Sequence, residues 1–142
     1  FDKIKNKCNL TIVTNNPKDK IYGINYLKSN LDNEKIYNLY NVNDILILPS
    51  KFDPYGFVLA EAASAGLAVI TTKFALGSKD TVTNEQSGFI CDTQEECIEK
   101  LEILLNNIEL IDEFKHFGFN KIKKKFEKKK LHRSFIDHIQ NI

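Results

Sequence analysis

The residues of this chain best suited to chemistry are two carboxylates, Asp53 and Glu61, which stand eight positions apart in the stretch FDPYGFVLAE. One carboxylate can accept two hydrogen bonds, which suits a vicinal diol such as a ribose. Gly56, between them, has no side chain to keep an incoming phosphate away from the backbone. If a helix begins near Phe57, its first N–H groups and the positive end of its dipole also form an anion site. These features favour a ligand that carries both phosphate and sugar.

The same stretch also has a purely structural interpretation. Asp at the first position, Pro at the second and Gly at the fourth are the preferences of a type I turn, which Asp53–Gly56 satisfies. Glu61 can equally be an acidic residue placed early in a helix because of the helix dipole. From residue types alone, both interpretations stand.

The pattern of apolar residues predicts the elements that position this stretch. Short β-branched or continuous apolar runs predict strands, and apolar residues at helical spacing predict helices. Their alternation predicts an α/β fold with an open, mostly parallel, Rossmann-like sheet flanked by helices. Ligands of such sheets bind outside the carboxyl ends of the strands, which is where the loop 51–57 falls. The predicted strands are 8–14, 21–27, 45–48, 67–72 and 88–91, and the predicted helices are 33–40, 58–65 and a helical region from Thr93 onward, with 73–80 irregular.

Length and composition fit one domain of an ordinary globular protein, with 142 residues, 42% hydrophobic and 27% charged. The three cysteines lack CxxC spacing and the three histidines lie in the C-terminal quarter, which argues against a disulfide framework or a zinc site and for a cytosolic setting. The absence of methionine, even at position 1, predicts an internal piece of a longer protein. Residues 121–142 carry a net charge of +6, while the rest carries −5, so this basic segment is either a solvated helix face or a contact for an anionic membrane surface.

The run LPSKFDPYGFVLAEAASAGLAVITT, residues 48–72, is more specific than its two carboxylates. It resembles the C-terminal domain of retaining glycosyltransferases of the GT-B fold, the group called family 4, whose signature reads PS-x-x-E-P-F/Y-G-x-x-x-x-E-A-x-A-x-G-x-P-V. The resemblance covers roughly residues 9–130. Further positions similar to the family are Leu39, Tyr40 and Asp44 upstream, and Gly77, Asp80, Val82 and residues 87–90 downstream.

The resemblance implies a role for each residue of the stretch. Asp53 and Glu61 take the places of the family's catalytic acidic pair, with Glu61 binding the ribose and Asp53 the hydroxyl groups of the donor sugar. The backbone at the start of the helix is implied at the diphosphate or the sugar. The implied donor-binding residues are Tyr55, Gly56, Phe57, Val58 and Glu61.

For the whole chain, the resemblance implies a nucleotide-sugar donor-binding domain over residues 1–142, the C-terminal half of a GT-B fold without its first β-α unit. The implied reaction is hexosyl transfer from a nucleotide sugar, most often a UDP-sugar, to a glycan or glycolipid acceptor, with retention of anomeric configuration and with no metal, other cofactor or nucleic acid. The acceptor would be bound by an N-terminal domain that this chain lacks. We therefore expect the chain alone to bind donor weakly and to have no transferase activity. Members of the family that build lipopolysaccharide, capsule or glycolipids work at the cytoplasmic membrane face, which implies a cytoplasmic enzyme, and the basic residues 121–133 are the segment that could help to hold it at the inner membrane face.

Three positions depart from the family pattern: Asp53 replaces a glutamate, Leu76 a glycine, and Ala68 a frequent proline. The shorter Asp53 has less reach toward a sugar, Leu76 is expected to crowd the pocket or shift its loop, and Ala68 to loosen a turn. Two alternatives stay open at this point. One is a non-catalytic Rossmann-like regulatory or scaffold domain, and the other is a nucleotide-sugar epimerase of the same fold.

Overall fold

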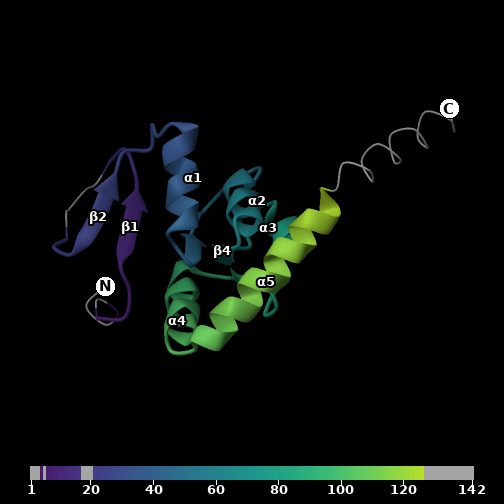
Figure 1. Ribbon diagram of the computed structural model, residues 1–142. Helices are drawn as coiled ribbons and strands as arrows, with labels where there is room; N and C mark the ends of the chain where they lie inside the picture. The colour runs from purple at the N-terminus through teal and green to yellow at the C-terminus, as the bar shows by residue number, and fades with distance from the viewer. Residues whose placement is uncertain (1–3, 5, 17–20, 127–142) are drawn as a thin grey trace, which may run out of the picture.

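The structure, a computed structural model, describes residues 4, 6–16 and 21–126 of the chain. Two strands open the described part of the chain, strands and helices then alternate from residue 24 to residue 105, and a further helix follows (Figure 1). The strands are β1 (Leu10–Val13), β2 (Ile24–Leu27), β3 (Ile45–Leu48), β4 (Ala68–Thr72) and β5 (Gly88–Cys91). The helices are α1 (Asn33–Asn41), α2 (Phe57–Ser64), α3 (Ser78–Thr81), α4 (Gln94–Leu105) and α5 (Ile108–Lys125).

Every strand pair within the described residues is parallel, which confirms the predicted fold class. The hydrogen bonds divide the strands into two ladders, one of β1 with β2 and one in the order β3-β4-β5. In the larger ladder, Ile45 pairs with Ala68 and Val69 with Gly88. The carboxyl ends of β3, β4 and β5 therefore meet at one edge, and the loops that follow them lie there together.

Strand β4 forms the centre of the core, and all five of its residues are buried. Successive side chains of a strand point to opposite faces of the sheet. Ala68 and Ile70 accordingly pack in a cluster with Leu104 of α4 and Phe114 of α5. Val69, in contrast, belongs to a second cluster, which includes Leu59 of α2. The sheet is thus covered on both faces, as its uninterrupted apolar strands require.

Helix α2 packs closely on the second face because its core side is lined by small residues. Ala62 and Ala63 are both buried there. Helix α5 runs across the molecule past α2 (Figure 1), and its Ile122 joins the same cluster. Gly118 of α5 is buried where an added Cβ would stand 3.4 Å from the Cβ of Ser87. The alanine-rich sequence of α2 and the glycine of α5 therefore allow close contact between these layers.

The ends of the helices follow from local side-chain chemistry. Asp32 caps α1, since its Oδ1 accepts the N–H of Lys35 at 2.8 Å. The short α3 was not predicted, because the sequence pattern indicated an irregular segment from 73 to 80. The helical region after Thr93 is divided at Asn107, whose Oδ1 accepts the N–H of Leu110 at 3.1 Å and so begins α5.

Two further predictions concern the C-terminal part of the chain. The apolar positions expected to continue the helical stripes, Leu131, Phe135 and Ile139, lie outside the described residues. The same holds for most of the basic segment from 121 to 133. No helix in the described part of the chain is both long and apolar enough to span a membrane.

Candidate donor-binding site

The loop that follows β3 is fixed to the neighbouring strands by side chains that bind its carbonyl groups. Thr72, at the end of β4, donates its hydroxyl to the Ser50 carbonyl oxygen at 2.5 Å. Gln94, the first residue of α4, donates its amide to the Pro49 carbonyl oxygen at 2.6 Å. Because Thr72 is buried, its hydroxyl needs such a partner, and the loop supplies it. The chain therefore leaves β3 along a defined path over the carboxyl edge of the sheet.

The loops after β3 and β4 then run side by side through an isolated parallel bridge between Asp53 and Ala75. The Asp53 N–H donates to the Phe74 carbonyl oxygen at 3.1 Å, and the Leu76 N–H donates to the Asp53 carbonyl oxygen at 2.9 Å. The Leu76 side chain is 63% exposed, so the position expected to crowd the pocket directs most of its surface to solvent. The bridge fixes Asp53 relative to the loop that leads into α3.

The side chain of Asp53 organises the turn at which α2 begins. Its Oδ1 accepts the N–H of Tyr55 at 3.0 Å and the N–H of Gly56 at 2.9 Å. Gly56 has a φ of +60°, in the left-handed region that glycine adopts without steric cost. A turn therefore forms here, held by the side chain of Asp53, and the Gly56 N–H already has an acceptor.

Helix α2 begins at Phe57, where the sequence predicted its start. The N–H of Leu59 donates to the Gly56 carbonyl oxygen at 3.0 Å, whereas the N–H groups of Phe57 and Val58 make no hydrogen bond to any described residue. Gly56 contributes no capping side chain. Two backbone donors at the positive end of the helix dipole are therefore available to an anion.

Two exposed aromatic rings flank this helix terminus. Tyr55 and Phe57 are each 68% exposed, and their rings stack with an interplanar angle of 3° and a centroid separation of 5.3 Å. The rings thus stand on either side of the buried Gly56 in sequence. The sequence analysis assigned Tyr55 and Phe57 to the donor site, and the structure places both at the start of α2.

Glu61 lies one turn further into α2, and its partner comes from α1. The hydroxyl of Tyr40 donates to Glu61 Oε2 at 3.0 Å. Burial, reinforced by the nearby Glu61 carboxylate, raises the pKa of the Tyr40 phenol well above its usual value. The phenol therefore stays protonated and remains a donor. In the sequence, Tyr40 is recognisable only as one position of a motif similar to the family, and its residue type alone indicates no role.

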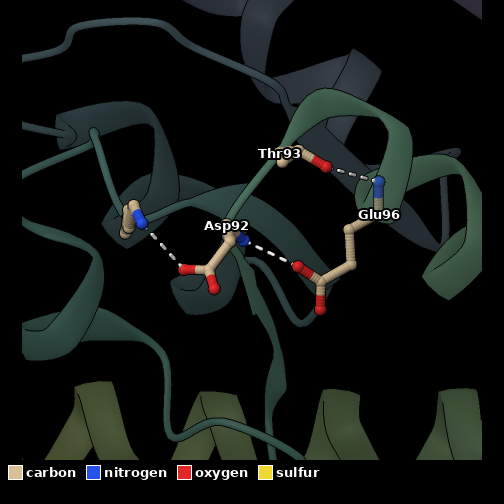
Figure 2. Close-up of polar contacts among 4 residues, drawn as sticks. Asp92, Thr93 and Glu96 are labelled. Atoms are coloured by element: carbon tan, nitrogen blue, oxygen red, sulfur yellow. Dashed lines mark hydrogen bonds and ion pairs between the residues drawn. The ribbon is translucent and has the colours of Figure 1, made fainter.

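A polar cluster that the sequence analysis missed lies on the same edge of the sheet (Figure 2). Lys73, the residue after β4, pairs with Asp92, the residue after β5, at 3.1 Å. The Asp92 N–H donates to Glu96 Oε2 at 2.7 Å, while Thr93 Oγ1 accepts the Glu96 N–H at 3.1 Å. This reciprocal pattern is a variant of the capping box that begins α4. The signal was present in the sequence as a Thr followed three positions later by a Glu.

Metal-binding side chains do not gather at this edge: the described residues contain no group of three or more His, Cys, Asp or Glu that could hold an ion. Cys8, Cys91 and Cys97 are free thiols. The pKa of the Cys91 thiol is raised to about 12, mainly because the residue is buried.

The sequence model of the family described as "Glycosyl transferases group 1" matches residues 23–121. The chain belongs to this family. The match includes the whole of the loop, α2 and the Tyr40–Glu61 pair. It supports the resemblance on which the donor-site assignments depend, at the level of the glycosyltransferase group.

Individual relatives agree with the family. The chain is 32% identical over 91 residues to the capsular polysaccharide biosynthesis glycosyltransferase CapM of Staphylococcus aureus, covering 63% of this chain and 24% of the relative. It therefore spans about a quarter of that protein's length. Among solved structures, the C-terminal domain of a glycosyl transferase group 1 family protein (LpcC) from Francisella tularensis superposes with a TM-score of 0.66 at 21% identity, covering 73% of this chain and 54% of the other. Sucrose-phosphate synthase from Thermosynechococcus elongatus gives 0.72 at 16% identity, covering 92% and 39%. Both structures share the fold of this chain.

Proposed function

We propose that this chain is the nucleotide-sugar donor-binding half of a glycosyltransferase, and that the whole protein transfers a hexosyl group to a glycan or glycolipid acceptor with retention of configuration. The observation that carries the proposal is the start of α2. There, the N–H groups of Phe57 and Val58 have no acceptor among the described residues. The Glu61 carboxylate follows one helical turn later.

In this proposal the helix terminus binds the diphosphate. Its two N–H groups and the dipole interact more strongly as negative charge grows on the departing diphosphate, which is electrostatic stabilisation of the leaving group. A helix that is packed against the sheet need not reorganise to do this. Leu59 and Ala62, both fully buried, hold α2 in that position.

The two carboxylates then have different tasks. Glu61 accepts hydrogen bonds from the ribose hydroxyls of the donor, since a carboxylate has lone pairs for both. Asp53 uses Oδ1 to hold the turn, and its Oδ2, which has no hydrogen bond to any described residue, is the atom proposed for a sugar hydroxyl. We propose a UDP-sugar as the donor, and we expect the 142 residues by themselves to bind donor weakly and to transfer no sugar.

The two alternative functions have less support. A scaffold domain would have no need for free N–H groups at the start of α2. Nor would it need a carboxylate beside them at this edge of the sheet. An epimerase would need both an acid and a base at the sugar, whereas Asp53 is the one titratable side chain proposed there. The compared proteins include a capsular polysaccharide biosynthesis glycosyltransferase and a sucrose-phosphate synthase, and this favours sugar transfer for the present chain.

We also propose that the enzyme is cytoplasmic and works at the inner face of the membrane, with residues 121–133 as the contact. The described end of α5 supports this, since Lys123, Lys124 and Lys125 follow one another and are exposed. Each basic residue near an anionic surface contributes about 1 kcal/mol of attraction. Sedimentation with phosphatidylserine vesicles at low and high salt tests the contact, and binding that ignores both salt and lipid charge would contradict it.

Calorimetric titration of the 142-residue chain with UDP- and ADP-sugars tests the donor assignment. We expect weak, saturable binding that is reduced about tenfold or more in Glu61→Gln. Glu99→Gln, an exposed glutamate of α4, is the matched control and should bind as the original chain does. Equal binding by both variants would contradict the role of Glu61, and no binding at all would favour the scaffold alternative.

A further inference from the structure

The hydrogen bond between Tyr40 and Glu61 links two helices at the proposed donor site. Tyr40 lies in the last turn of α1, and Glu61 lies in α2. The 3.0 Å contact from the phenol to Oε2 is the one hydrogen bond or ion pair that the Glu61 side-chain carboxylate makes within the described residues. This contact therefore decides where that carboxylate points.

The two side chains differ in how firmly they are held. Glu61 is exposed, and a free glutamate loses considerable rotamer freedom when it is fixed in one position. Tyr40 is partly buried, and its ring packs against the core cluster that contains Leu59 and Ala62. The ring is therefore anchored in the core while its hydroxyl reaches the surface, so it can hold an otherwise mobile carboxylate.

A phenol is also the right kind of partner for a carboxylate that must bind a ligand. A lysine or arginine would neutralise Glu61 and compete for both of its oxygens. A phenol donates one hydrogen bond and carries no charge, so Oε1 and the remaining lone pairs of Oε2 stay available. The contact orients Glu61 without consuming its capacity to accept two hydroxyl groups.

We propose that Tyr40 is a positioning residue for nucleotide recognition, which holds the Glu61 carboxylate in the orientation that accepts the vicinal ribose hydroxyls of the donor. This inference rests on the proposed donor-binding function and adds the residue that selects for an intact ribose. It assigns Tyr40 no contact with the reacting atoms.

The test compares ribose with dideoxyribose in the 142-residue chain. UDP, ADP and GDP are titrated first, and the tightest binder is then compared with its 2′,3′-dideoxy counterpart. We expect the original chain to prefer the ribonucleotide by about tenfold, because the hydroxyls donate to a charged acceptor. In Tyr40→Phe this preference should fall to about twofold, while affinity for the dideoxy nucleotide should stay unchanged. A change that only disturbed the fold would weaken both ligands alike.

Tyr37→Phe is the matched control, because Tyr37 is on the same helix but is 62% exposed. It should keep the full ribose preference. A second measurement needs no variant: the ¹³Cζ resonance of Tyr40 should move when the ribonucleotide binds and stay in place with the dideoxy nucleotide.

The outcomes separate the inference from the function on which it rests. If the original chain prefers the ribonucleotide and Tyr40→Phe keeps that preference, or the Tyr40 resonance does not respond, the positioning role is wrong while the donor-binding function stands. If the original chain binds none of the three nucleotides, both proposals are wrong.

Discussion

An added Cβ on Gly77 would lie 2.3 Å from the backbone carbonyl oxygen of Tyr55. The two loops that form the candidate site therefore touch backbone to backbone. The φ of Gly77 is −75°, which any residue can adopt, so glycine is required here for space and not for backbone conformation. This contact joins the start of α3 to the turn that begins α2.

We expect Gly77→Ala to destabilise the protein by about 1–3 kcal/mol, because the turn must shift to admit the methyl group. Unfolding in urea, followed by circular dichroism, measures the change. Leu76→Ala is the neighbouring control, since that side chain is mostly exposed, and it should change the free energy of unfolding by less than about 0.5 kcal/mol. If Gly77→Ala had the same free energy of unfolding as the original chain, the two loops would not be packed as described.

Substitutions of Asp53 should separate its structural task from its ligand task. Asp53→Ala removes the acceptor for two N–H groups and should cost about 1 kcal/mol of folding stability. Asp53→Asn keeps a side-chain oxygen for both, so its stability should be close to that of the original chain, while its affinity for a donor sugar falls. If Asp53→Asn bound donor unchanged, Asp53 would be a turn residue and not a ligand of the sugar.

Stability at alkaline pH should depend on Tyr40. Its phenol pKa is raised in the folded protein, mainly by burial, so between the ordinary pKa near 10 and the higher folded value the unfolded chain releases a proton that the folded chain retains. The free energy of unfolding should therefore be at its full value below about pH 10 and fall as the pH rises further. Tyr40→Phe should show a shallower fall over this range than Tyr37→Phe. Parallel curves for the two variants would contradict the burial of Tyr40.

Much of this fold could be predicted from the sequence because its strands are short apolar runs bounded by turn residues. The parallel strands, the start of α2 at Phe57 and the loop at the carboxyl edge all follow from that pattern. The short α3 was missed, since four residues are too few to show helical periodicity. Its position is set by the contact of Gly77 with Tyr55, which is tertiary.

Ala68 illustrates how residue type alone misleads at a departure from the family pattern. The sequence analysis expected it to loosen a turn in place of a proline. In the structure its N–H donates to the Asp44 carbonyl oxygen at 2.9 Å, a bond that proline cannot make. The residue thus adds a hydrogen bond at the start of β4.

The candidate site, too, could be predicted from the sequence only in part. The residue types of Asp53, Gly56 and Glu61 suggested an anion and sugar site, and the spacing placed them around a helix start. The bonds that Asp53 Oδ1 accepts from the next residues are local to the turn, whereas the contact between Tyr40 and Glu61 joins side chains of two separate helices. The contact between the helices is not encoded in any local pattern, so the sequence alone could not reveal it.

The response of backbone amides to a nucleoside diphosphate shows whether the start of α2 is the donor site. In ¹⁵N–¹H spectra of the 142-residue chain titrated with UDP, we expect the Phe57 and Val58 amides to shift most, because their N–H groups gain a phosphate acceptor. Inorganic phosphate at equal concentration should cause a smaller shift of the same two amides. If UDP left both in place, or shifted mainly the amides at the start of α4, the donor site would not be at the start of α2.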